Sequence, residues 1–204
     1  MTRARLALFL VLATAYCAAR AEETVVICYD YGCASQARIR YADAQLAAIR
    51  NLLAGAQDAA RERMRLALVV GWLYSWAGRQ SPIHNDRGGD FADDAAEGRM
   101  DCIDHAQSTT RLLRMVEARG WMRFHRVLAP ARRTRYFVTQ HFSAVVQENA
   151  VASRTPLVAG TSAAHVGDEG SGARFVIDTW FLDNGMPAVV LPLDDWMSGA
   201  GPDV

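Results

Sequence analysis

Three side chains whose types suit nucleophilic catalysis lie far apart in this chain. Cys102 stands in the string Asp-Cys-Ile-Asp-His-Ala (101–106), where a helical pattern begins. His141 and Asp178 lie downstream, on two strand-like runs. A thiol nucleophile needs a base, and the base needs a carboxylate that orients it, brought together in space and not in sequence. The three positions therefore predict a cysteine-dependent acyl-transfer enzyme.

Two histidines compete as the base for this thiol. His105 lies three residues after Cys102 on the same predicted helix, and His141 lies on a predicted strand. Facing residues on paired strands bring their Cβ atoms about 4.5–5.5 Å apart. We therefore expect His141 and Asp178 to hydrogen-bond across the sheet. We expect no comparably placed carboxylate beside His105, because Asp104 points to a different helix face, and we favour His141.

The start of a helix is a favourable place for a thiolate. Unpaired backbone N–H groups and the positive end of the helix dipole favour the ionised form of a thiol there. This effect is worth only about 0.3–1 kcal/mol at an exposed site. Asp101 and Asp104 oppose it by charge repulsion, although both residues suit a helix start. The site therefore needs an imidazolium close to the sulfur.

The first 21 residues have the layout of a secretory signal peptide. Arg3 and Arg5 precede an apolar run over 6–15, and a small-x-small sequence at 19–21 offers a cleavage site. An uncleaved anchor helix is the alternative. We expect residues 22–204 to form one domain that is periplasmic or secreted, with no stable membrane span after cleavage.

The cysteine count supports the choice of nucleophile. Cys28 and Cys33 are close in sequence and form the natural disulfide pair in an oxidising compartment. Cys17 lies within the predicted signal peptide, so Cys102 is the odd thiol of the mature chain. A buried inert thiol or an intermolecular link is the alternative.

Charge argues against nucleic acid as a partner. The whole chain has a formal net charge of zero, and removal of residues 1–21 leaves 19 arginines against 22 acidic residues. No lysine occurs in the chain, and the arginines form no basic stripe. The expected partner is therefore a protein or peptide substrate.

The hydrophobic pattern changes its period along the chain. An extended piece at 25–31 and helices at 43–53, 57–77 and 101–120 come first; strands at 122–128, 136–147, 174–182 and 188–191 follow. A polar loop at 78–99 leads into Cys102, and a loop-rich insertion covers 149–173. This order predicts an α+β fold with helices packed on an antiparallel sheet.

The three motifs resemble those of a known superfamily. The string Asp-Cys-x-Asp-His-Ala, the Gln-His-Phe strand and the Val-Ile-Asp-Thr-Trp strand are similar to the transglutaminase-like cysteine proteinases, with the bacterial exported group as the nearest. The likeness covers roughly 57–182. It implies a papain- and transglutaminase-like core, with Cys102 as nucleophile, His141 as base and then acid, and Asp178 holding the imidazole. It also implies a thioester that water or an amine resolves.

The resemblance bears on calcium as well. The exported proteinases bind calcium through acidic residues that flank the cysteine, whereas here the flanks are Asp101 and Ile103. We therefore expect no required cofactor and keep a weak calcium site at Asp101 as an alternative. Four further carboxylates without EF-hand spacing leave room for another oxygen-ligand site; these are Asp86, Asp90, Asp93 and Asp94.

The oxyanion of an acyl transfer needs donors beside the nucleophile. The backbone N–H of Cys102 is the natural first donor, and Gln140, Asn85 and Trp180 are weak candidates for the second. Trp180 is expected rather to pack over the His–Asp pair and to keep water out. The arginine cluster at 132–135 is expected to be a solvated turn, and contact with the substrate is the alternative.

Two further function classes remain open from the sequence. One is a catalytically silent envelope or periplasmic binding domain of the same fold, with an inert Cys102. The other is a zinc site built from Cys102, His105 and His141. The remaining histidines are expected to be solvated; these are His84, His125 and His165.

Overall fold

The computed structural model of this chain describes residues 22–89, 93, 96–135, 139–149 and 172–202. The predicted signal peptide, most of the predicted insertion at 149–173, and the positions of His165, Asp90 and Asp94 lie outside these residues. No helix within the described ranges is both long enough and apolar enough to cross a membrane.

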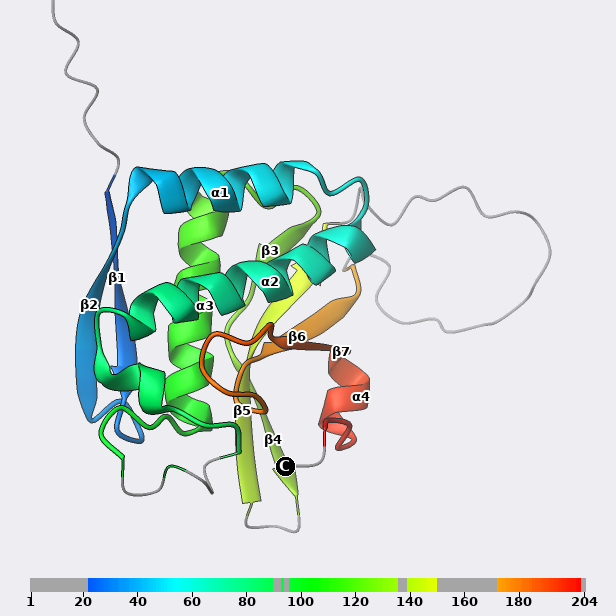
Figure 1. Cartoon of the computed structure of the whole chain (residues 1–204). Coiled ribbons are helices and arrows are strands. Elements are labelled where there is room, and N and C mark those ends of the chain that lie inside the picture. Colours follow the sequence, from blue (N-terminus) through cyan, green and yellow to red (C-terminus); the bar gives the residue numbers. More distant parts are fainter. Residues whose placement is uncertain (1–21, 90–92, 94–95, 136–138, 150–171, 203–204) are drawn as a thin grey trace, which may run out of the picture.

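The elements form a mixed α+β arrangement (Figure 1). A ribbon of β1 (Glu23–Tyr29) and β2 (Ser35–Tyr41) is followed by helices α1 (Asp43–Ala54) and α2 (Ala59–Gly78), the short 3-10 helix η1 (Pro82–Asn85) and α3 (Cys102–Ala118). The later elements are β3 (His125–Val127), β4 (Ala131–Arg135), β5 (Thr139–Glu148), β6 (Arg174–Asp178), β7 (Val189–Pro192) and α4 (Leu193–Met197).

The main sheet is antiparallel and is built around β5. Its order is β3-β5-β6-β7, and β4 also pairs with β5. Helix α3 packs against β5 on one side and against β1 on the other, while α1 and α2 run across α3 (Figure 1). The helix that begins at Cys102 therefore lies directly on the strand that carries His141.

One hydrophobic core joins the helices to the sheet. Its fully buried members come from every described layer, including β1, β2 and η1; those that join the helices to the sheet are Ile49, Leu53, Leu66, Val70, Leu73, Leu112, Leu113, Val116, Ala144, Val146 and Ile177. The helical residues recur at spacings of three and four, as one buried stripe requires. Burying each large aliphatic side chain contributes roughly 1.5–3 kcal/mol, so this core fixes where α3 sits on β5.

The predicted fold class is confirmed at the level of α+β with helices on an antiparallel sheet. The three predicted helices are present with small shifts at their ends. The expected turn at 132–135 was wrong, because this segment forms β4 and Arg133 is buried. Strand β2 and helix α4 were not predicted. The alternation of β2 is visible in the sequence, where Ala37, Ile39 and Tyr41 alternate with polar residues, so missing this strand was an error. The five residues of α4 are too few to show a helical period.

Candidate active site

Cys102 is the first residue of α3. Asp101 is the N-cap, and its Oδ1 accepts hydrogen bonds from the backbone N–H groups of Ile103 and Asp104 at 3.0 and 2.9 Å. The thiol is partly exposed and takes no part in a disulfide. Its Sγ lies 3.8 Å from the carbonyl oxygen of Gln140 on β5. The sulfur therefore lies beside the residue that precedes His141.

His141 and Asp178 form the hydrogen bond that the sequence predicts. Nε2 of His141 lies 2.8 Å from Oδ2 of Asp178, and both residues are buried. Ala144 pairs with Ile177, so the carboxylate lies diagonally from the imidazole and not directly opposite it. A long side chain reaches a diagonal neighbour on the same face of a sheet. The hydrogen bond between His141 and Asp178 was expected. The two residues were expected to face each other directly on the paired strands, and they lie diagonally instead.

Three aromatic rings surround the imidazole of His141. The ring centroids of Trp180, Phe181 and Trp196 lie 4.7, 5.4 and 5.5 Å from that of His141. Trp180 thus packs on the imidazole, as expected. Phe181 and Trp196 are buried, so the part of the imidazole that these rings cover is shielded from bulk water.

Trp196 also orients the carboxylate. Its indole Nε1–H donates to Oδ2 of Asp178 at 2.9 Å, and the backbone N–H of Trp180 donates to Oδ1 at 3.2 Å. Arg133 holds the C-terminal segment in place by donating to the carbonyl oxygens of Trp196 and Ala200 at 2.6 and 2.8 Å. Trp196 could not be predicted from its neighbours, because the five residues of α4 are too few to show a period.

The hydrogen-bond pattern assigns distinct roles to the two ring nitrogens of His141. An ionised carboxylate only accepts hydrogen bonds, so Nε2 carries the proton that faces Asp178. Nδ1 is then the nitrogen that can take a proton from a nucleophile. A thiol on the α3 side of β5, an imidazole and a buried carboxylate are the parts needed for nucleophilic catalysis.

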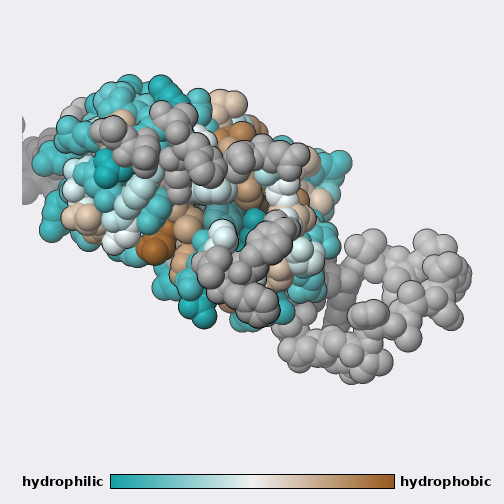
Figure 2. Space-filling model, turned by 90° about the horizontal axis from the view of Figure 1, so that it is seen from below, coloured by the Kyte–Doolittle hydropathy of each residue, from teal (hydrophilic) through white to brown (hydrophobic). Residues whose placement is uncertain are grey.

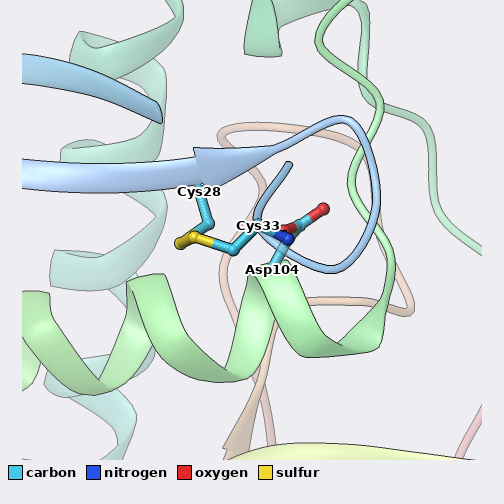
Figure 3. Close-up of side chains that lie close together, drawn as sticks. All are labelled: Cys28, Cys33 and Asp104. Carbon is cyan, nitrogen blue, oxygen red and sulfur yellow. A yellow bond between two sulfur atoms is a disulfide. The ribbon is translucent and has the colours of Figure 1, made fainter. Parts of the chain in front are cut away.

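The start of α3 is held by the loop that follows β1 (Figure 3). The predicted disulfide between Cys28 and Cys33 is present. Residues 30–33 all have φ between 62° and 66°, and three of them are not glycine, which is a costly conformation. The backbone N–H groups of this loop point at two carboxylates. Those of residues 31 and 33 donate to Asp104, and that of residue 32 donates to Asp101.

Burial and the neighbouring charge of Asp101 raise the pKa of Asp104 to about 6. The donors from the loop pull in the opposite direction, since they favour the charged carboxylate. The N–H groups of the disulfide loop thus offset part of the negative charge of the two acids that oppose a thiolate at Cys102.

The donor set does not fit calcium at Asp101. Both of its carboxylate oxygens accept backbone N–H groups, so they face donors rather than a cation. One oxygen of Asp86 and one of Asp93 accept from the backbone N–H groups of Met100 and Arg87, while the other oxygen of each is buried without a hydrogen bond from the described part of the chain. Among the described residues, the only cluster with metal-ligand spacing is Cys28, Cys33 and Asp104, and its two sulfurs form the disulfide.

His105 differs from its expectation. A carboxylate does lie beside it: Nε2 of His105 is 3.2 Å from Oδ2 of Asp86, and Nδ1 is 2.8 Å from Oγ1 of Thr179. The sequence did not predict this contact, because Asp86 lies in an irregular polar segment. With Nδ1 hydrogen-bonded, Nε2 directed at Asp86 and only 3% of the residue exposed, His105 is poorly suited to act as a base or to join Cys102 and His141 in a zinc site.

The side chains of the remaining candidate residues are either exposed or held by other parts of the chain. The side-chain amide of Asn85 donates to the carbonyl oxygen of Glu97 at 3.0 Å, and the side chain of Gln140 is exposed. His84 is exposed, as expected. His125 was expected to be solvated, and this was wrong: it is buried on β3, with Nδ1 2.9 Å from Oε1 of the buried Glu62.

Figure 2 views the molecule from the end at which β4 and β5 protrude in Figure 1. Hydrophobic residues reach the surface in the middle of this face, between hydrophilic flanks.

Comparisons of the chain with models of protein families, with curated proteins and with solved structures give no match. The assignment of a function therefore depends on the geometry and on the three motifs.

Proposed function

We propose that this chain is an exported cysteine-dependent hydrolase of peptide or amide bonds, in which Cys102, His141 and Asp178 are nucleophile, base and orienting carboxylate. The observation that carries the proposal is the 2.8 Å hydrogen bond between His141 and Asp178, beside a sulfur that contacts the carbonyl of Gln140. The resemblance of the three motifs to the transglutaminase-like cysteine proteinases supports the same roles. The signal-like sequence at 1–21 supports a periplasmic or secreted location.

The reaction follows from the roles of the three groups. Nδ1 of His141 takes the proton of the Cys102 thiol, and the thiolate attacks the carbonyl carbon of the substrate. The tetrahedral intermediate collapses when the imidazolium gives its proton to the leaving amine, and a thioester remains on Cys102. A water molecule, deprotonated by His141, then attacks the thioester and releases the acid. Asp178 keeps the imidazole in the tautomer that this cycle needs.

The oxyanion lies near the first turn of α3 in this proposal. The backbone N–H of Cys102 and the positive end of the helix dipole stabilise the charge that develops on the carbonyl oxygen. The hydrogen bond from Asn85 to Glu97 argues against its amide as the second donor. Gln140 keeps its exposed side chain for that role.

An amine can replace water in the second half of the reaction. The product is then a new amide, as in a transglutaminase, and the first half-reaction is unchanged. Because the chain has no lysine, it cannot supply a side-chain amine of its own as the acceptor. An acceptor lysine must therefore come from another molecule.

The test is trapping of Cys102 with a thiol-directed electrophile, read by peptide mass spectrometry so that Cys17 is scored separately. Wild type and His141→Ala are compared at pH 6 and pH 9, with His84→Ala as a control because His84 is an exposed histidine on η1. An unassisted thiol with a pKa near 8.5 is only about 0.3% ionised at pH 6. We expect wild type and His84→Ala to react rapidly at pH 6 and His141→Ala to react slowly.

Equal labelling of wild type and His141→Ala at pH 6 refutes His141 as the base. Slow labelling of all three proteins favours the competing function, a catalytically silent binding domain with an inert thiol. A fluorescent primary amine, offered together with a glutamine-containing peptide, separates hydrolysis from acyl transfer. Cys102→Ser controls for labelling that does not pass through the thioester.

A further inference from the structure

A second buried histidine–carboxylate pair lies close to the proposed active site. His105 follows Cys102 by three residues on α3, and its Nε2 is 3.2 Å from Oδ2 of Asp86. Its Nδ1 is 2.8 Å from Oγ1 of Thr179, which directly follows Asp178. Through its contact with Thr179, His105 thus joins the helix that carries the thiol to the end of the strand that carries the orienting carboxylate.

The contact belongs to a longer buried network. Oγ1 of Thr179 also lies 3.0 Å from Oγ1 of Thr109 on α3, and the hydroxyl of Tyr74 on α2 lies 3.1 Å from that of Thr109. Burial raises the pKa of Asp86 and of Tyr74. Every one of these groups loses its water on folding, so the hydrogen bonds mainly offset a desolvation cost.

Such a network is a weak source of stability. Well-packed apolar residues in the same volume are often as stable as a buried polar pair or more so. What the polar groups add is geometry, because a hydroxyl between two partners fixes its own rotamer and the backbone that carries it. The backbone fixed here is the turn after β6, whose residue 180 donates its N–H to Asp178.

We propose that Thr179 and His105 are positioning residues, which hold the carboxylate of Asp178 in register with the imidazole of His141. The inference rests on the proposed function for its link to catalysis, and on the contacts alone for its structural part. His105 itself stays away from the reacting atoms, because its Nδ1 is hydrogen-bonded to Thr179 and its Nε2 lies beside Asp86.

The test compares Thr179→Val with Thr179→Ser. Valine keeps the volume and removes the hydroxyl, while serine keeps the hydroxyl and removes a methyl group. The readout is the hydrogen exchange of the His141 Nε2–H, followed by NMR, since this proton is protected by its bond to Asp178. We expect exchange at least tenfold faster in Thr179→Val than in Thr179→Ser, about the effect of one lost hydrogen bond. Circular dichroism verifies that both variants fold.

Equal exchange in the two variants overturns the positioning role, whatever the chemistry of Cys102. If Thr179→Val does not fold, His105→Asn against His105→Leu gives the same comparison, because the asparagine amide can replace Nδ1 toward Thr179. Labelling of Cys102 at pH 6 then tests the link to catalysis. If Cys102 is labelled equally fast in wild type and in His141→Ala, the proposed function is refuted. The exchange result alone then decides the positioning role.

Discussion

Replacing Asp178 by asparagine changes the proposed site while leaving its shape nearly intact. Oδ2 of Asp178 accepts from His141 and from Trp196, and Oδ1 accepts from the backbone N–H of Trp180. An asparagine offers one acceptor and one NH₂ group in place of two acceptors. Either orientation of the amide therefore sets an N–H group against another donor.

The more harmful orientation turns the NH₂ group toward His141 and Trp196. The imidazole can keep a hydrogen bond only by moving its proton from Nε2 to Nδ1, which removes the base that we propose for the thiol. The other orientation keeps the imidazole but replaces a charged acceptor by a neutral one. A hydrogen bond to a charged group is worth roughly 1.5–3 kcal/mol, and at 1.36 kcal/mol per tenfold this corresponds to a loss of about 10- to 150-fold.

The assay is the rate at which iodoacetamide alkylates Cys102, measured at pH 6 and at pH 9 in wild type and Asp178→Asn. We expect the pH 6 rate to fall by about 10- to 150-fold and the pH 9 rate to change little, because an unassisted thiol is mostly ionised there. Asp194→Asn is the matched control, since Asp194 is exposed on α4. An unchanged pH 6 rate in a folded Asp178→Asn protein would show that the carboxylate does not support the base.

Three more results are expected. Trp196→Phe removes one donor to Asp178 and should lower the pH 6 alkylation rate roughly tenfold; a rate equal to wild type contradicts this. Replacing both Cys28 and Cys33 by serine should lower the free energy of unfolding, measured in urea, by about 2 kcal/mol, the loop-closure value for so short a ring; no change contradicts this. The pKa of Asp104 is raised to about 6 from 3.8, so folding favours its protonated form. Its contribution to stability is therefore full below about pH 4 and is lost as the pH rises through about 6. The unfolding free energy of wild type relative to Asp104→Asn should fall over this window, and a flat difference refutes the shift.

The residues whose side chains suit nucleophilic catalysis could be predicted from the sequence. Cys102 was the odd thiol at a helix start, and strand alternation selected His141 and Asp178. These signals are local, because each needs only a residue type and the period of its own element. The diagonal register between the two strands could not be read in advance, since it depends on how the chain passes from β5 to β6.

The residues that support the site carry no such signal. Trp196 lies on a five-residue helix and Asp86 lies in an irregular segment, so neither has a period that reveals its face. Their contacts span 18 and 19 residues, to Asp178 and to His105. Such partners are fixed by tertiary packing, of α4 on β6 for Trp196 and of α3 for His105, which no residue pattern specifies.

The support of the site comes from three separate parts of the chain, and this explains why sequence patterns reveal the nucleophile more readily than its surroundings. The disulfide loop holds the start of α3, the His105 network holds the end of β6, and Arg133 holds the segment that carries Trp196. A nucleophile, a base and an orienting carboxylate can each be only a few residue types. A supporting hydrogen bond can come from any donor that reaches, including the backbone. Supporting positions are therefore free to vary in type, and only their spatial arrangement identifies them.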